Sequence, residues 1–217
     1  MKHLNKTIEL FEEHIDTYEN WFQEHPKILE TEALAFRSLL PVGDLHGIEV
    51  GMGAGHLAKA IGIHEGVEPS EVLRKEAMRK GLEVSDGRAE DLPFKDLKFD
   101  FVIIGTAIHY FEDLDKAFSE AFRVLKQSGI LIIGFLDASG EIGKVHMENR
   151  LKSVFYRDAK FYNLKTIKRK LLTSGFNYLE EFQTLFGKES EIKEVQPIES
   201  GTGKGSFILI RAKKKNT

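Results

Sequence analysis

Short apolar runs alternate with amphipathic segments through the middle of the chain. Residues 114–125 are of the amphipathic kind, because their apolar side chains recur at helical spacing and share one face. Residues 100–105 form a continuous apolar run, suited to a strand that is buried on both faces of a sheet. Alternation of this kind predicts strands joined by crossover helices, as in a parallel sheet. The expected strands are residues 45–50, 62–68, 82–84, 100–105, 129–136, 176–186 and 206–211.

Helical patterns occupy the segments between and before these strands. Residues 4–40 are expected to form helices that Pro26 interrupts. We therefore predict an α/β fold with a doubly wound, mostly parallel, seven-stranded sheet, helices on both faces, an antiparallel last strand and an N-terminal helical extension. The other expected helices are residues 69–80, 114–125 and 164–174, with a helical stretch at residues 145–156.

Composition describes an ordinary single-domain protein and excludes several kinds of site. The 217 residues are 41% hydrophobic and 30% charged, and the net charge of −3 disfavours wholesale binding to a polyanion such as nucleic acid. No apolar run approaches the roughly 20 residues that a membrane span needs, and the first residues lack the pattern of a signal peptide, so a cytoplasmic location is expected. The chain has no cysteine, and its histidines lack metal-ligand spacing, so no metal is expected.

The segment 47–57 carries the most specific chemistry. An apolar strand runs into three alternate glycines, Gly51, Gly53 and Gly55, and then into a helical run. Glycine lets a ligand approach the bare backbone, and the start of the following helix offers unpaired N–H groups. A dinucleotide-binding loop would need glycine or alanine at position 56, where this chain has His56. The loop therefore predicts a nucleotide-like ligand other than a dinucleotide.

Further landmarks follow this loop in order. Glu68 ends the second expected strand, 19 positions after Glu49, and a carboxylate there can accept hydrogen bonds from both hydroxyls of a ribose. The remaining landmarks are Gly87-Arg88-Ala89-Glu90-Asp91-Leu92-Pro93-Phe94, then Phe99-Asp100-Phe101-Val102, then Arg123-Val124-Leu125-Lys126-Gln127-Ser128-Gly129. Together with the E-x-G-x-G-x-G loop, this series resembles the class I S-adenosylmethionine-dependent methyltransferases from about residue 45 to residue 175.

The resemblance implies S-adenosylmethionine as cofactor and a set of residues that hold it. One residue departs from the family pattern: Arg88 stands where an aspartate commonly contacts the adenine amino group. Arginine has only donors, so Arg88 is expected to stack on the adenine while backbone groups at residues 89 and 90 read it. The implied cofactor-binding residues are Tyr18, Trp21, Glu49, Gly51, Met52, Gly53, Gly55, Glu68, Pro69, Arg88, Ala89, Glu90, Thr106, Ala107 and His109.

The resemblance also divides the single domain and suggests where an acceptor binds. Residues 1–40 are expected to form a helical cap, 41–136 the cofactor-binding core and 137–163 an acceptor lid. Residues 164–212 would add a helix and edge strands, and 213–217 a tail. His109 is the candidate general base, because its ordinary pKa suits proton transfer. The candidate acceptor-binding residues are Tyr110, His146, Tyr156 and Tyr162.

We expect in-line methyl transfer to a small molecule, with three alternatives. RNA or protein is the second class of acceptor, although the segment Gly105-Thr106-Ala107-Ile108 lacks the prolines typical of the family's amino-methylating nucleic-acid enzymes. An NAD-dependent reductase is another alternative, because it would also bind a nucleotide at a glycine-rich loop. Such a reductase would have glycine or alanine where this chain has His56. A protein that holds the cofactor without transferring methyl is the last alternative.

Overall fold

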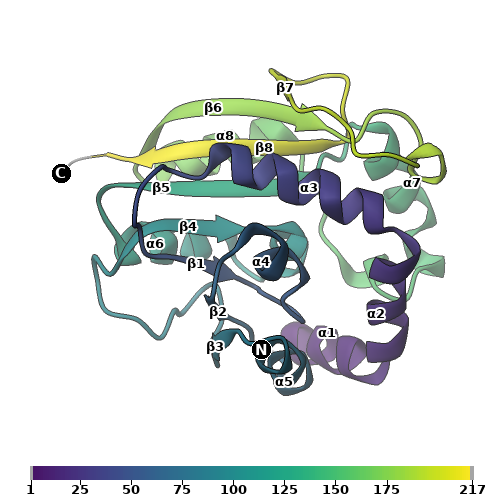
Figure 1. The fold of residues 1–217 in the computed structure, drawn as a ribbon, viewed down its shortest axis with the longest axis horizontal. Coiled ribbons are helices and arrows are strands. Elements are labelled where there is room, and N and C mark those ends of the chain that lie inside the picture. Colours follow the sequence, from purple (N-terminus) through teal and green to yellow (C-terminus); the bar gives the residue numbers. More distant parts are fainter. Residues whose placement is uncertain (1, 216–217) are drawn as a thin grey trace.

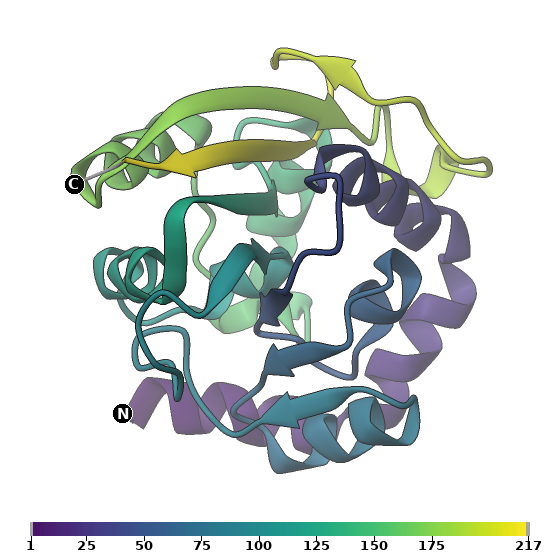
Figure 2. The ribbon, with the colours of Figure 1, turned by 60° about the vertical axis from the view of Figure 1, so that its left-hand side comes forward.

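The computed structural model describes the backbone of residues 2–215 and the side chains of residues 6–177 and 179–215. Three helices come first: α1 (Lys2–Glu13), α2 (Ile15–Glu24) and α3 (Pro26–Leu39). The predicted interruption at Pro26 is confirmed, because α2 ends at Glu24 and the proline is the first residue of α3, where its missing N–H costs nothing. Figures 1 and 2 show α1 beside α5 (Glu71–Arg79), with α2 leading along one end of the sheet to α3.

The chain then alternates between strands and helices, as the apolar pattern predicts. The strands are β1 (Gly47–Val50), β2 (Glu65–Val67), β3 (Glu83–Ser85), β4 (Phe99–Ile104), β5 (Leu125–Leu136), β6 (Phe176–Thr184), β7 (Glu199–Ser200) and β8 (Phe207–Lys214). The remaining α-helices are α4 (His56–Ile61), α6 (Leu114–Val124), α7 (Glu141–Asn149) and α8 (Leu164–Thr173). Four 3₁₀ turns are η1 (Thr106–Tyr110), η2 (Arg150–Lys152), η3 (Tyr156–Asp158) and η4 (Glu189–Glu191).

The sheet has the order β3-β2-β1-β4-β5-β8-β6-β7. Strands β1 to β5 run parallel to one another, and β8 is antiparallel to both β5 and β6. The α/β class and the antiparallel last strand are confirmed. The expected number of strands was one too low, because the two residues of β7 pair with Phe182 and Gln183 at the edge of the sheet. A strand of two residues is too short for alternating apolar and polar positions to be recognised in the sequence.

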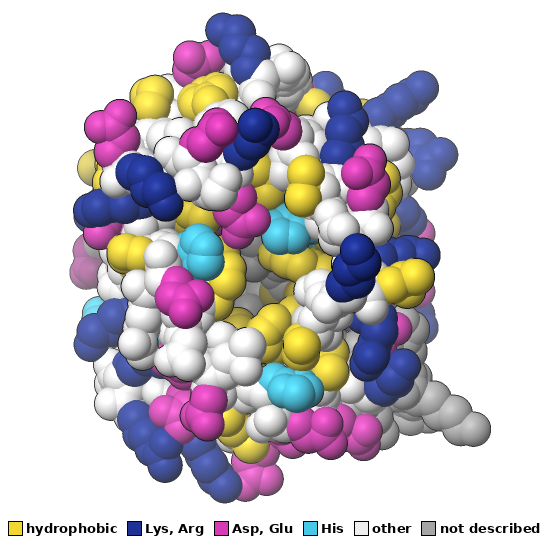
Figure 3. Space-filling model, turned by 90° about the vertical axis from the view of Figure 1, so that its right-hand side faces the viewer, with side chains coloured by type: hydrophobic (Ala, Val, Ile, Leu, Met, Phe, Trp, Pro, Cys, Tyr) yellow, Lys and Arg dark blue, Asp and Glu magenta, His cyan; other side chains and the backbone are white. Residues whose placement is uncertain are grey.

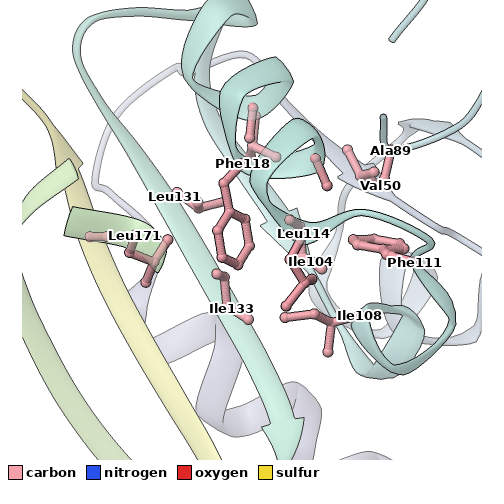
Figure 4. Close-up of a cluster of buried hydrophobic side chains, with 14 of the residues drawn as sticks. Val50, Ala89, Ile104, Ile108, Phe111, Leu114, Phe118, Leu131, Ile133 and Leu171 are labelled. Carbon is pink, nitrogen blue, oxygen red and sulfur yellow. The ribbon is translucent and has the colours of Figure 1, made fainter. Parts of the chain in front are cut away.

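Two apolar clusters fill the faces of the sheet, because successive strand residues point to opposite sides. Val102 and Ile104 belong to the cluster under α6 and α8, whereas Phe101 and Ile103 belong to the cluster under α3, α4 and α5. Figure 4 shows Phe118 of α6 against Leu131 and Ile133 of β5, with Leu171 of α8 on their other side. The helices on both faces are therefore confirmed.

The structure corrects the prediction at the end of the chain. Lys213 and Lys214, expected to fray, continue β8. The Lys214 ammonium is buried and donates hydrogen bonds to the carbonyl oxygens of Phe122 and Leu125, at 2.6 and 2.7 Å. Residues 216–217 of the expected tail lie outside the described residues.

Within the described residues, no helix is both long and apolar enough to cross a membrane.

Candidate functional site

A cavity opens at the carboxyl ends of the parallel strands, where open α/β sheets place their ligands. Figure 3 shows this side of the molecule, with hydrophobic side chains in the hollow and histidines close to its edge. Most of the site residues predicted from the sequence meet here, although they come from seven segments of the chain. Those that line the cavity are Tyr18, Trp21, Gly51, Gly53, Glu68, Pro69, Arg88, Ala89, Glu90, Thr106, Ala107, Tyr110, His146 and Tyr156.

The glycine loop and Glu68 lie against each other at one wall. The Gly53 N–H donates to Glu68 Oε2 at 2.9 Å, and the Ser70 N–H donates to Glu68 Oε1 at 2.9 Å. Gly53 has a φ of +56°, and a Cβ there would lie 2.6 Å from the Tyr18 hydroxyl. Glycine is therefore required both for the turn and for the open backbone that faces the cavity. The loop and the carboxylate share one cavity.

Burial raises the pKa of each of the two carboxyl groups near the loop above its ordinary value. It raises the pKa of Glu68 to about 7, despite the hydrogen bonds from Ser70 and Gly53 and the charge of Arg74, which lower the pKa. Burial likewise raises the pKa of Glu49 to about 8, and Glu49 Oε2 has no hydrogen-bond partner among the described residues. Glu49 does not line the cavity, so its unpartnered oxygen is a place for an ordered water molecule.

The loop 87–90 forms a further wall of the cavity, and Glu112 forms hydrogen bonds with its two charged side chains. Arg88 Nη2 donates to Glu112 Oε2 at 2.8 Å, and Glu90 Oε1 accepts from the Glu112 N–H at 2.7 Å. Both side chains therefore tie the loop to the segment that precedes α6. Ala89, between these two side chains, lines the cavity. These walls place the glycine loop and the Glu68 carboxylate at one cavity, where the resemblance implies that S-adenosylmethionine binds.

Comparison with known proteins gives the same answer. A sequence profile described as "Methyltransferase domain" matches residues 48–133. A solved S-adenosylmethionine-dependent methyltransferase from Thermotoga maritima, described as a possible histamine N-methyltransferase, shares 38% identity and a TM-score of 0.92, covering 95% of this chain and 99% of the other. The chain belongs to the class I S-adenosylmethionine-dependent methyltransferases.

Two other similarities accompany this one. An uncharacterized protein of Methanocaldococcus jannaschii is 36% identical over 207 residues, which is 95% of this methyltransferase and 100% of the relative. A phosphoethanolamine N-methyltransferase of Haemonchus contortus, solved with S-adenosylmethionine, shares the fold at a TM-score of 0.64 and 17% identity, covering 85% of this chain and 52% of that one. The cofactor of this methyltransferase is S-adenosylmethionine.

His109 is not placed to act as the general base. Its ring is fully buried in η1 and does not line the cavity of the methyltransferase. Nδ1 lies 2.9 Å from the carbonyl oxygen of Lys160, which makes Nδ1 the donor, and Nε2 has no partner among the described residues. Burial lowers the pKa of His109 to about 4, so the imidazole is neutral and shielded at neutral pH. The His109 ring therefore lies on the side of η1 that does not line the cavity.

Four other predicted residues also stand behind the wall. Met52 is buried with its side chain against Gly66, and Glu49 is buried beside Gly105. Gly55 is the left-handed N-cap of α4 in this methyltransferase, and Tyr162 packs against the core under α6. None of the four lines the cavity, so each shapes it through its neighbours.

The far part of the cavity is formed by the N-terminal helices and the segment after β5. His146 Nε2 lies 2.9 Å from Glu189 Oε2, and the His146 and Tyr156 rings are 4.4 Å apart. Burial raises the pKa of Glu189, but the hydrogen bond and charge of His146 outweigh it, so the pKa is lowered overall. Glu32 of α3 lines the same part.

Sequence reasoning missed Glu32, Glu189 and the aromatic residues Phe11, Phe22 and Phe155, all of which line the cavity. A signal for Glu32 exists in the helical spacing. Ile28, Glu32 and Phe36 follow one another at intervals of four and so share the buried face of α3. A glutamate on an apolar face is costly unless a partner meets it. Glu189 carries no local signal, since it sits in a single 3₁₀ turn.

Among residues 6–177 and 179–215, no group of three or more histidine, aspartate or glutamate side chains is arranged to hold a metal ion.

Proposed function

We propose that this methyltransferase acts on a small-molecule acceptor that binds in the far part of the cofactor cavity. The observation that supports this is a single continuous cavity, lined at one part by Gly53, Glu68 and Ala89 and at another by Trp21 and Tyr156. Both parts lie under the N-terminal helices, so an acceptor would be enclosed rather than laid on an open surface. An enclosed, largely aromatic pocket with few polar groups is typical of a site for a small ligand.

The residues of the chain supply binding, orientation and the exclusion of water. When bound, S-adenosylmethionine supplies an electrophilic methyl carbon that an acceptor atom attacks in line, as the carbon–sulfur bond breaks. Glu68 and the backbone of residues 51–53 hold the adenosyl part in one orientation, and the aromatic walls orient the acceptor and keep water out. Alignment of this kind supplies roughly 7–11 kcal/mol of the barrier reduction.

A proton released by the acceptor needs a base, and His146 takes the role that His109 cannot. His146 lines the cavity, and its Nε2 is hydrogen-bonded to Glu189 at 2.9 Å. A carboxylate in this position orients an imidazole and stabilises its protonated form. His146 and Glu189 therefore form the acid–base pair of the proposed reaction.

RNA and protein are the second class of acceptor. The net charge of −3 and the carboxylates of the far part disfavour a polyanion. The direct test follows label from methyl-labelled cofactor into a cell extract separated into small molecules, RNA and protein. We expect the label in the small-molecule fraction; label confined to RNA or protein would replace the proposal with the second class.

Substituting Glu68 tests the cofactor site. The Glu68→Ala variant loses a charged acceptor, and such hydrogen bonds contribute about 1.5–3 kcal/mol each, so we expect S-adenosylhomocysteine to bind at least about tenfold more weakly in calorimetry. Glu71→Ala is the matched control, since Glu71 begins α5 three residues later and is exposed. Unchanged affinity in a folded Glu68→Ala protein would contradict this role for Glu68.

A further inference from the structure

The far part of the cavity holds more acidic than basic side chains. We define the acidic pocket as the lining residues Trp21, Phe22, Glu32, His146, Tyr156 and Glu189. They come from α2, α3, α7, η3 and η4, so five separate segments build it. No lysine or arginine belongs to this set, and Arg88 at the other wall is held by Glu112. The pocket therefore has two carboxylates and one imidazole.

Glu32 is the carboxylate without a partner. Among the residues that the structure describes, Glu32 makes no hydrogen bond and no ion pair. Its helix neighbours on the same face, Ile28 and Phe36, are buried in the core, so Glu32 cannot turn away to solvent without disturbing that face. Burial and the nearby charge of Glu189 raise the pKa of Glu32 to about 8, because an unpaired carboxylate out of water is costly, and an incoming cation relieves that cost by favouring the ionised form.

Glu189 does not supply the missing partner, because it is also an acid and is already engaged. His146 occupies Glu189 through their contact of 2.9 Å, which leaves the Glu32 carboxyl without a partner among the described residues. The other titratable groups that face these acids are Tyr156 of η3 and His25 between α2 and α3. Neither places a fixed positive charge beside Glu32.

Aromatic rings form the remaining walls of the pocket. The Trp21 and Phe22 ring centroids are 5.1 Å apart and nearly perpendicular, and Tyr156 lies against His146. Such rings cover an apolar ligand body, and their faces attract a cation. Rings beside an unpaired carboxylate match a ligand that has an apolar body and a positively charged end.

We propose that the acidic pocket binds the ammonium group of a small organic amine, with Glu32 as its direct partner, and that such amines are the acceptor class of this methyltransferase. This proposal rests on the proposed function, since it assigns the acceptor of the same site. The ammonium donates hydrogen bonds to the Glu32 carboxylate, and Trp21, Phe22 and Tyr156 enclose the body of the amine. The nitrogen accepts methyl only after it has given one proton to His146, and its lone pair then forms the carbon–nitrogen bond as the carbon–sulfur bond of the cofactor breaks. Glu32 is then a specificity-determining residue.

The test compares amines with alcohols of the same shape. Calorimetry measures phenethylamine against phenethyl alcohol, and butylamine against butanol, on the protein saturated with S-adenosylhomocysteine. We expect the Kd of each amine to be at least about tenfold lower than the Kd of its alcohol, because a hydrogen bond to a charged group contributes that much affinity. Equal binding of both members in both pairs, or no amine binding at millimolar concentration, overturns the proposal.

Three variants assign the preference to Glu32. Glu32→Gln keeps the shape and removes the charge, so it should bind amine and alcohol within about twofold of each other. Glu32→Asp keeps the charge and should retain most of the preference. Glu30→Gln, on the exposed side of the same helix, is the matched control and should bind like the unaltered protein. An unaltered amine preference in Glu32→Gln, with a melting temperature that shows it folded, overturns the assignment.

The failure of this proposal can be told apart from the failure of the proposed function. S-adenosylhomocysteine binding is measured first, and its absence contradicts the methyltransferase site itself. In that case the amine and alcohol comparison is repeated on the protein alone, where the charge preference of the pocket is still measurable. If Glu32→Gln weakens cofactor binding and leaves the amine preference intact, Glu32 serves the cofactor and the proposal is wrong.

Discussion

Single titratable side chains in this methyltransferase differ most in whether they face the cavity or stand behind it. Glu68 and His146 face it, and each contacts a named partner, Gly53 or Glu189. Glu49 and His109 stand behind the wall with one unpaired atom each. Residue type alone does not separate the two groups, because burial decides which imidazole or carboxylate meets a ligand.

The buried His109 makes stability depend on pH in a predictable direction. Its pKa is near 6.5 in the unfolded chain and about 4 in the folded protein. Below pH 6.5 the unfolded chain binds a proton that the folded protein refuses, so stability falls as the pH drops from 6.5 toward 4. We expect the protein to lose about 2 kcal/mol more than a His109→Asn variant between pH 7 and pH 5, in denaturant unfolding. Parallel curves for the two proteins would show that His109 is protonated when folded.

At the scale of elements, α1 and α2 form a cover over the cavity. Phe11 of α1 stacks on Phe155 at a centroid distance of 4.9 Å and meets Tyr110 at 5.2 Å. Tyr18 of α2 reaches the glycine loop, so the cover touches both parts of the site. Other contacts of these helices are polar, with Glu12 accepting from Ser70 Oγ at 2.8 Å and Glu19 paired with His56 and Lys80, unlike the continuous apolar packing of the core under α6 and α8. A cover of this kind can open without unfolding the sheet.

Loosening this cover should speed the release of the cofactor. Phe11→Ala removes the ring that joins α1 to Phe155 and Tyr110, and we expect S-adenosylhomocysteine to dissociate about tenfold faster in stopped-flow measurements. Amides of residues 2–13 should also exchange hydrogen faster. Phe11→Leu keeps most of the apolar volume and is the control. An unchanged dissociation rate in Phe11→Ala would mean that α1 does not hold the cofactor in.

At the scale of the whole molecule, the site joins distant parts of the chain. Its lining begins at Thr7 and ends at Glu189, with the ends of β1, β2 and β4 between them. A ligand in this cavity would contact the N-terminal helices, the sheet and the segment after β5 at once. Binding should therefore stabilise the entire fold rather than one element.

Ligand binding should raise the melting temperature strongly and selectively. At a concentration of S-adenosylhomocysteine near one hundred times its Kd, the gain is about 2.7 kcal/mol, or roughly 5–10 °C for a chain of this size. NAD⁺ at the same concentration should leave the melting temperature unchanged, because His56 replaces the glycine or alanine of a dinucleotide loop. A comparable shift with NAD⁺ would restore the reductase alternative.

Much of the cofactor side was predictable from local sequence. The strand before Gly51, the helix after it and the carboxylate at Glu68 are signalled by spacing, because backbone conformation and β-strand ends are governed by near neighbours. The structure brings Gly53 and Glu68 together, as their order along two adjacent parallel strands requires. The role of each residue toward the cofactor stays a prediction until binding is measured.

What the sequence by itself determined is the alternation of strands and helices, the glycine loop and the landmarks of the methyltransferase family. Only the tertiary structure decided that His109 is buried, that His146 meets Glu189 and that Glu32 faces the cavity without a partner. The physical reason is the range of the interactions involved. Turns and periodicity depend on residues a few positions apart, whereas burial and ion pairing depend on which distant segments the packed sheet brings to the same edge.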